Sequence, residues 1–299
     1  MEVTSSATKA INASDSRRRA WRPGWFISLS IVIHLLAVAM VIWRPETWLW
    51  ALTIVAANNF LITVLGLWPH GNWLGSNWTR LPEPARLNGE IALTIDDGPD
   101  PVVTPKVLDI LDRYHVKASF FCIGEKALAH ADLCREIVAR GHTIENHSMH
   151  HGRLFSTMGV AGLSREIGQA QRTLTTITGD RPKFFRAPAG LRNLFLDPVL
   201  HRLGLQLSSW STRGFDTSIS CPKRVKARLL RGLKAGAIIL MHDGYAAVDG
   251  DGRSMIELVL PELIESAVER GLKFVTLRDA MPLTPARSFT DRGFDSGIS

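Results

Sequence analysis

The stretch EIALTIDDGP, residues 90–99, decides the fold, because a short apolar run ends abruptly there in two aspartates, a glycine and a proline. The run 90–95 is apolar and bounded by turn residues, which is typical of a buried strand. Gly-Pro is turn chemistry that ends such a strand. Asp96 and Asp97 therefore stand at the carboxyl end of a predicted strand, although Asp-Asp-Gly-Pro is also an ordinary turn sequence.

Beyond this stretch, β-rich runs alternate with helical ones to near the end of the chain. Further strands are predicted at 117–123, 143–146, 183–185, 205–210, 236–241 and 273–276. Helical periodicity occurs over about 103–114, 125–140, 160–178, 194–203, 222–234 and 254–270. Seven strands alternating with helices predict a parallel α/β domain over 90–282, and we expect a barrel. In such barrels, functional side chains gather at the carboxyl ends of the strands.

A histidine cluster follows one of these strands directly, in HSMHHGRL at 147–154. His147 and His151 are four residues apart, so they share one face of a helical turn and can converge on one metal ion. His147 and His150, at a spacing of three, remain an alternative pair. Polar stretches follow other predicted strands in the same way: RAPAG (186–190), SWSTRGFDT (209–217) and LMHD (240–243).

In order and spacing these motifs resemble those of the NodB-type polysaccharide deacetylases, carbohydrate esterase family 4. The family carries T-F-D-D-G-P, H-[ST]-x-x-x-H, R-P-P-Y-G, D-W and L-x-H motifs. Here they read TIDDGP, HSMHHGRL, RAPAG, SWSTRGFDT and LMH, within about residues 90–280. The resemblance implies a distorted (β/α)7 barrel and a metal-dependent hydrolase that removes the N-acetyl group of an amino sugar.

The resemblance also assigns the central residues. Asp97, His147 and His151 would hold one divalent metal ion, for which zinc is expected. Three protein ligands leave a position open for water and the acetyl carbonyl oxygen, as a catalytic site requires. Asp96 would be the general base, and His242 the general acid that protonates the departing amine.

Supporting residues follow from the same motifs. Arg186 matches the residue that pairs with the base, and Asp216 matches the carboxylate that orients the acid histidine. Leu240 resembles the leucine beside the acetyl methyl group. Pro188 and Ala189 belong to the substrate-binding third motif, whose backbone N–H near Ala189 would help to stabilise the tetrahedral oxyanion.

Two departures from the family pattern bear on the substrate. Ala189 stands where the family has tyrosine, and Thr217 stands where it has tryptophan. Both changes remove aromatic walls on which sugar rings stack. The catalytic set is complete, so activity is expected, but a long polysaccharide substrate is not.

The chain before this domain indicates a membrane. Eight of the nine tryptophans lie at or before Trp78, and nineteen uncharged residues run from Trp25 to Trp43. A second uncharged run extends from 47 to 68, although Asn58 and Asn59 at its centre weaken that interpretation. We predict two transmembrane helices, 25–43 and 47–68, forming a tight hairpin. Cleavage of a signal peptide after Ala37-Val38-Ala39 is the alternative.

Charge sets the predicted orientation. Four arginines precede the first helix, at 17, 18, 19 and 22, whereas the connection carries only Arg44 and Glu46. The positive-inside rule then makes residues 1–24 cytoplasmic and returns the catalytic domain to the cytoplasm. Three cysteines without a CxxC pair suit that reducing compartment. We expect 69–89 to be an interfacial linker and 283–299 a mobile tail.

These features together predict an enzyme of the bacterial inner membrane. Its substrate would be an amino sugar on undecaprenyl phosphate, used for lipid A or surface polysaccharide. The net charge of +7 favours anionic partners. Because the sequence contains no zinc-finger motif or repeat, we do not expect nucleic acid to be that partner. The basic stretch 222–234 has two interpretations. It either attracts anionic lipid or is an ordinary solvent-exposed face of a helix. An externally facing peptidoglycan or polysaccharide deacetylase and a non-enzymatic scaffold on the same barrel are the alternatives.

Overall fold

The computed structural model describes residues 20–282, so Arg17, Arg18, Arg19 and the predicted tail 283–299 lie outside the described part. Within it, nine strands form one sheet whose ladders are all parallel. The strands are β1 (Asn77–Trp78), β2 (Glu90–Asp96), β3 (Ser119–Cys122), β4 (Thr143–Asn146), β5 (Phe184–Phe185), β6 (Gln206–Ser208), β7 (Thr212–Arg213), β8 (Ile238–His242) and β9 (Lys273–Phe274). The predicted parallel α/β fold is confirmed.

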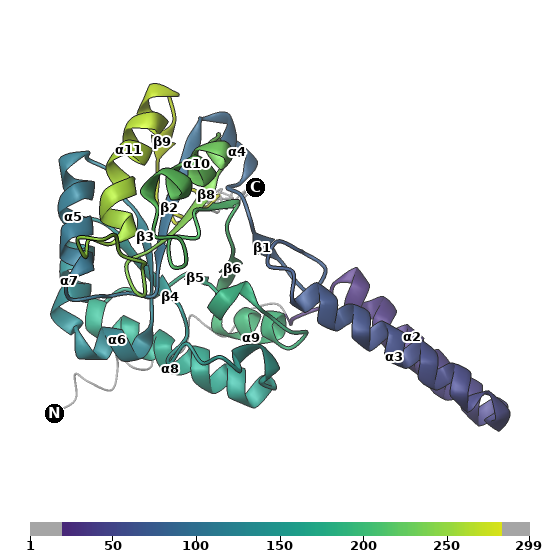
Figure 1. Ribbon diagram of the computed structural model, residues 1–299. Helices are drawn as coiled ribbons and strands as arrows, with labels where there is room; N and C mark the ends of the chain where they lie inside the picture. Colours follow the sequence, from purple (N-terminus) through teal and green to yellow (C-terminus); the bar gives the residue numbers. More distant parts are fainter. Residues whose placement is uncertain (1–19, 283–299) are drawn as a thin grey trace, which may run out of the picture.

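The sheet curls into a half-barrel with helices outside it (Figure 1). Its order is β1-β6-β5-β4-β3-β2-β8-β7, and β9 pairs with β2. The domain helices are α4 (Glu83–Leu87), α5 (Val103–Arg113), α6 (Gly124–Ala129), α7 (Ala131–Ala139), α8 (Val160–Thr178), α9 (Leu196–Leu203), α10 (Pro222–Gly232) and α11 (Met255–Glu269). Short 3-10 turns lie at η2 (Phe155–Thr157) and η3 (Pro188–Gly190).

All seven predicted strands are present, and the two unpredicted ones, β1 and β7, each have two residues. Strands that short carry no readable alternation of side chains. The helix expected over 125–140 is divided into α6 and α7, because the backbone of His130 between them is not helical, with φ −131° and ψ 50°. Neither difference changes the layered architecture.

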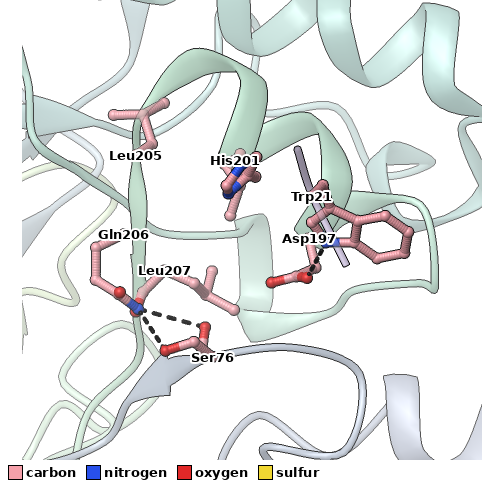
Figure 2. Close-up of a pocket in the computed structure, with 8 residues that line it drawn as sticks. Trp21, Ser76, Asp197, His201, Leu205, Gln206 and Leu207 are labelled. Carbon is pink, nitrogen blue, oxygen red and sulfur yellow. Dashed lines mark hydrogen bonds between the residues drawn. The ribbon is translucent and has the colours of Figure 1, made fainter. Parts of the chain in front are cut away.

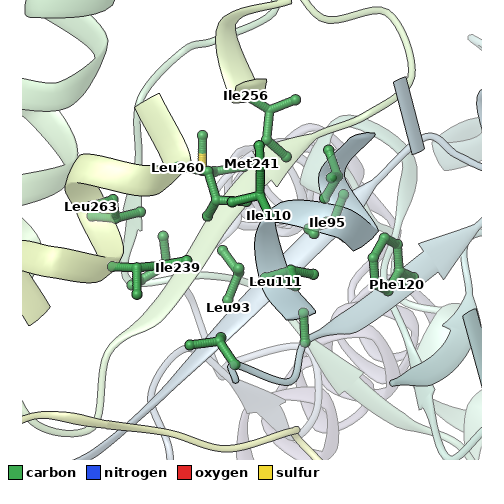
Figure 3. Close-up of a cluster of buried hydrophobic side chains, with 14 of the residues drawn as sticks. Leu93, Ile95, Ile110, Leu111, Phe120, Ile239, Met241, Ile256, Leu260 and Leu263 are labelled. Carbon is green, nitrogen blue, oxygen red and sulfur yellow. The ribbon is translucent and has the colours of Figure 1, made fainter. Parts of the chain in front are cut away.

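Alternating side chains on the central strands separate two apolar layers. Leu93, Ile95, Ile239 and Met241 face outward and pack against α5 and α11 (Figure 3). The residues between them on β2 and β8 point into the half-barrel, because successive side chains on a strand point to opposite faces. The interior layer includes Ala92, Phe121, Phe184, Trp210 and Leu240. The positions at the carboxyl end of this inward face remain for the polar residues of the site.

A pair of apolar helices precedes the domain and projects away from it (Figure 1). They are α2 (Trp25–Trp43) and α3 (Trp48–Gly66), joined by the short turn η1 (Pro45–Thr47). Both are long and apolar enough to cross a membrane. Only 17% and 22% of their most apolar windows are buried, so they are not core helices of the domain.

The polar residues of this hairpin pair with one another across its two helices. Asn58 donates a hydrogen bond to the hydroxyl of Ser30, and the Asn59 amide lies 3.2 Å from Nε2 of His34. Asn59 also donates to the carbonyl of Val55 at 2.9 Å. Amides that find such partners are tolerated in an apolar medium. The two asparagines that weakened the sequence interpretation therefore fit a paired hairpin.

The segment expected as an interfacial linker, 69–89, is folded onto the domain in part. Trp78 lies in β1 and packs on Phe184, with ring centroids 5.1 Å apart. Trp73 instead contacts Trp25 at the base of the hairpin, at 4.9 Å. The backbone groups of β1 pair with those of β6. The sequence pattern did not predict this short edge strand.

The chain ahead of the hairpin is also attached to the domain. Trp21 donates a hydrogen bond from Nε1 to Asp197 of α9 at 2.7 Å (Figure 2). These two residues line a small cavity of about 130 Å³ together with Ser76 and Gln206. None of the predicted catalytic or metal residues lines this cavity. It belongs to the attachment of the hairpin rather than to the candidate site.

Candidate metal centre and active site

The carboxyl ends of the central strands bring the predicted site residues together. Asp96 ends β2 and lies in register with His242, which ends β8. His147 directly follows β4, and Arg186 directly follows β5. Because all these strands are parallel, their carboxyl ends meet at one rim of the half-barrel.

Asp97, His147 and His151 form a group that could hold a metal ion. One candidate ligand atom from each lies within 4.8 Å of the others. Nε2 of His147 and Nε2 of His151 are each 3.2 Å from Oδ1 of Asp97. Among the residues that the structure describes, this is the one such group of three or more histidine, cysteine or acidic side chains.

The hydrogen bonds of this group fit a metal site. Oδ1 of Asp97 is buried and, within residues 20–282, has no hydrogen-bond partner. Nδ1 of His147 donates to the carbonyl of Arg186 at 2.9 Å, which leaves Nε2 with a lone pair for a metal. Burial alone would raise the pKa of Asp97, but the imidazoles of His147, His151 and His242 lower it to about 2. A carboxylate and two imidazoles around an unpaired oxygen suit a divalent ion.

Left-handed backbone recurs at the rim. Asp97, Ser148, His151 and Ala189 have φ values of 72°, 67°, 52° and 53°, although none is glycine. Such conformations cost energy and persist where surrounding contacts enforce them, commonly at functional sites. Here they turn the chain sharply after β2, β4 and β5.

Asp96 is held by a fully buried arginine. Nη1 of Arg186 donates to Oδ1 of Asp96 at 2.6 Å and to the hydroxyl of Thr94 at 2.9 Å. Its remaining nitrogens donate to the carbonyls of Ser208 and Ser209 at 3.1 and 2.9 Å. Burial lowers the pKa of Arg186, and the charge of Asp96 opposes that shift. Each guanidinium nitrogen is therefore paired, and the carboxylate has a fixed counter-charge.

His242 is paired with Asp216 on the other side of the rim. Oδ1 of Asp216 lies 3.0 Å from Nδ1 of His242, and Oδ2 accepts the backbone N–H of His242 at 2.8 Å. Burial lowers the pKa of His242, but the Asp216 carboxylate more than compensates and raises it to about 9. The imidazole is protonated at neutral pH, and Nε2 remains available to a ligand.

The remaining predicted residues lie around this centre. His150 turns away, with Nδ1 3.0 Å from the Glu166 carboxylate on α8. Pro188 is buried in η3 and Ala189 is exposed beside it. Leu240 is only 2% exposed and belongs to the apolar layer beneath the site.

The base of the hairpin packs on two loops of the site. The carbonyl of Gly66 accepts the backbone N–H of Arg192 at 3.1 Å, in the loop after η3. The carbonyl of Pro69 accepts the hydroxyl of Ser209 at 2.7 Å. The ring of His70 meets Trp210 edge to face, with centroids 5.7 Å apart. The segment that follows α3 therefore forms part of the wall around the third and fourth motifs.

Sequence reasoning assigned no role to three residues that the structure brings to the rim. Lys126 donates to the carbonyl of the metal-site residue Asp97 at 2.8 Å. Thr94 links Arg186 to the carbonyl of Ile239, to which it donates at 2.7 Å. Arg213 lies on β7 within the fourth motif. Only Arg213 had a sequence signal, because it lies three residues before Asp216 within the fourth motif.

Comparison with known proteins agrees with this geometry. Residues 85–208 match the polysaccharide deacetylase family model. The chain is 33% identical over 190 residues to a chitooligosaccharide deacetylase of Bradyrhizobium sp. (strain ANU 289), covering 61% of this chain and 86% of that one. It is 35% identical over 166 residues to a peptidoglycan-N-acetylglucosamine deacetylase of Listeria monocytogenes, covering 55% and 35%.

Solved structures show the same relationship. A family 4 carbohydrate esterase from Streptomyces lividans is similar with a TM-score of 0.57 and 29% identity. The similarity covers 62% of this chain and 92% of that one.

Proposed function

The chain belongs to the NodB-type polysaccharide deacetylases, carbohydrate esterase family 4, and we propose that it acts on an N-acetylated amino sugar carried by a polyprenyl phosphate. Its membership makes it a hydrolase of the N-acetyl amide bond of sugars. The observation that carries the finer proposal is the attachment of an apolar hairpin to loops of the active site.

Asp97, His147 and His151 would hold the divalent ion, and we propose zinc from their nitrogen and oxygen donors. When bound, such an ion polarises the amide carbonyl and acidifies a water molecule. The Nδ1–H bond of His147 to the Arg186 carbonyl keeps its Nε2 aimed at Asp97. His150 takes no part, since Glu166 binds it.

The proton transfers fall to two pairs of side chains. Asp96 accepts the proton of the attacking water, and Arg186 pairs with that carboxylate and orients it. His242 donates its Nε2 proton to the departing amine. Asp216 holds His242 in the charged form, since the pKa of the imidazole is raised to about 9.

Three further residues complete the substrate side. The backbone N–H near Ala189 is the proposed donor to the tetrahedral oxyanion. Pro188 shapes that turn, and Leu240 supplies apolar surface for the acetyl methyl group. The absence of aromatic side chains at Ala189 and Thr217 leaves the groove without two stacking walls, which favours a short sugar over a long polymer.

The hairpin supports a substrate that stays in the membrane. Its outward side chains are large and apolar, with Ile42 77% and Trp43 81% exposed. Burying such surface in lipid is favourable at about 25 cal/mol per Å². A hairpin inserted in the bilayer holds the site close to the membrane surface, where the sugar of a lipid-linked substrate lies. Arg22, with the arginines of residues 17–19, favours the cytoplasmic side of an inner membrane.

An externally facing peptidoglycan or polysaccharide deacetylase is the second candidate, because relatives named for peptidoglycan and chitooligosaccharides share the domain. The two candidates differ in the side of the membrane that the domain occupies. Alkaline phosphatase, which is active only when exported, can be fused to the carboxyl terminus. The fusion is expected to be inactive, and an active fusion would favour the second candidate.

Purified full-length protein in lipid nanodiscs tests the substrate itself. We expect deacetylation of polyprenyl-phosphate N-acetylglucosamine to exceed that of chitooligosaccharide at equal concentration. Asp96→Asn is the inactive control, since it keeps the three metal residues and removes the base. Preference for the oligosaccharide would contradict the lipid-linked proposal while leaving the deacetylase activity in place.

A further inference from the structure

Arg213 is a second arginine at the site, and unlike Arg186 it forms no direct ion pair with a carboxylate among the described residues. Within residues 20–282, no hydrogen bond or ion pair reaches its guanidinium, and its Nε is buried without a partner. Burial lowers its pKa, and the charges of Asp216 and Asp96 oppose that shift. A buried, unpaired donor is costly unless it has a function. Arg213 therefore offers an open site for an anion.

Strand register places Arg213 on the reactive face. Arg213 of β7 is the register partner of Leu240 on β8, and Leu240 is the partner of Thr94 on β2. Register partners in a sheet point to the same face, and so do residues two apart along one strand. Arg213 thus shares the inward face with Asp96 and His242, near the end of the half-barrel where they lie.

Aromatic rings hold the guanidinium in place. Its Cζ lies 3.9 Å from the ring centroid of Phe215 and 5.4 Å from that of Trp210. Trp210 also contacts Arg186, whose Cζ is 5.9 Å from its ring. Stacked guanidinium groups keep their in-plane N–H donors free for a phosphate or carboxylate. One indole therefore separates the arginine that binds Asp96 from the unpaired one.

The neighbourhood of Arg213 leads toward the membrane hairpin. His70, four residues after the end of α3, meets Trp210 edge to face. The pKa of His70 is lowered, first by burial and then by the positive charge of Arg213. Arg213 consequently lies between the acid–base pairs and the segment that emerges from the hairpin.

We propose that Arg213 is a specificity-determining residue that binds the phosphate of a sugar-phosphate substrate. In a 2-acetamido sugar 1-phosphate, the phosphate is on the carbon next to the one that bears the acetamido group. A sugar whose amide reaches Asp96 and His242 then brings its phosphate to the same rim, and a polyprenyl chain continues toward the hairpin. This inference rests on the proposed function and adds how the enzyme distinguishes a sugar phosphate from a neutral sugar.

The test compares a charged and a neutral sugar on the full-length protein in nanodiscs. The probes are N-acetylglucosamine 1-phosphate and its methyl glycoside. The variants are Arg213→Gln, Arg213→Lys and Arg228→Gln. Arg228 of α10 is the matched control, because its Cζ lies 5.1 Å from the same Phe215 ring. Equilibrium binding and kcat/KM are measured separately for each sugar.

For wild-type protein and Arg228→Gln, we expect kcat/KM for N-acetylglucosamine 1-phosphate to exceed that for the methyl glycoside by about tenfold or more. This is the scale of a charge-assisted bidentate contact. Arg213→Gln should bring the ratio close to unity, mainly through KM, and Arg213→Lys should restore part of it. An unchanged ratio in Arg213→Gln overturns the inference. Equal loss for both sugars, or the same loss in Arg228→Gln, also overturns it, because Arg213 would then position Asp216 or act through net charge.

Two further arms separate the outcomes. If the protein binds the sugar phosphate more tightly than the methyl glycoside but deacetylates neither, the proposed function is contradicted and the role of Arg213 is not. Farnesyl-phosphate and uridine-diphosphate esters of N-acetylglucosamine distinguish the two sources of a sugar phosphate. We expect the farnesyl ester to be the better substrate, and a preference for the nucleotide ester would overturn the membrane-side placement of the phosphate.

Discussion

Replacing Asp216 by asparagine should change the pH dependence of catalysis more than its maximum. Asparagine has the size of aspartate, and its one carbonyl oxygen can still accept the hydrogen bond from Nδ1 of His242, while its NH2 group replaces the oxygen that accepts the backbone N–H. It lacks the charge that holds the imidazole protonated. The substitution therefore separates the orienting effect of Asp216 from its electrostatic effect.

The magnitude follows from the pKa of His242. Asp216 is the main group that raises this pKa, from its ordinary 6.5 to about 9 against the effect of burial. At about 1.4 kcal/mol per tenfold change in proton affinity, that interval corresponds to about 3 kcal/mol. A general acid works only while protonated, so wild-type activity persists as the pH rises and is lost through about 9. Without the charge of Asp216, the lowering by burial and the raising by Asp96 and Asp97 oppose each other, so we expect the loss near the ordinary imidazole pKa of about 6.5.

The assay is kcat/KM against pH for wild-type protein, Asp216→Asn and the control Asp251→Asn, in which an exposed loop carboxylate is removed. At pH 8 we expect kcat/KM of Asp216→Asn to be about thirtyfold below that of the wild type, and at pH 6 less than about twofold below it. Asp251→Asn should match the wild type throughout. An equal loss at both pH values, or an unshifted alkaline limb, would refute His242 as the general acid charged by Asp216.

Further substitutions test the other parts of the site. His151→Ala should remove most of the bound metal in elemental analysis of the purified protein, whereas His150→Ala should retain it. Arg186→Gln leaves a buried carboxylate unpaired and should lower the free energy of unfolding by about 3–5 kcal/mol in a denaturant titration. Gly66→Val places a side chain against the backbone of loop 188–192, so activity should fall while metal content stays constant.

Local patterns were sufficient for most of the fold. The strand at 90–96 ends at the predicted aspartates, and the helix at 160–178 has the predicted bounds. Both are long and strongly patterned, so their type is readable from periodicity. The strands β1 and β7 have only two residues each, and tertiary pairing rather than local pattern defines them.

The metal group was predictable because it depends on short spacing and on strand ends. His147 and His151 are four residues apart in the loop after β4, although that loop is not the helical turn that the spacing suggested. Asp97 follows β2, which β3 separates from β4 in the same parallel sheet. The attachment of the hairpin to the site was not predictable. The contact between Pro69 and Ser209 spans 140 positions of sequence and depends on how the whole domain packs. No periodicity in either segment indicates it.

The central claim is that this chain deacetylates a lipid-linked amino sugar at the membrane. It is tested most directly by mass spectrometry of polyprenyl-phosphate sugars from cells that produce either the wild-type chain or Asp96→Asn. The account predicts that cells with Asp96→Asn accumulate the N-acetylated lipid, and that wild-type cells contain a form lighter by the acetyl group. Identical lipid profiles, together with deacetylation of cell-wall glycan only by the wild type, would contradict it.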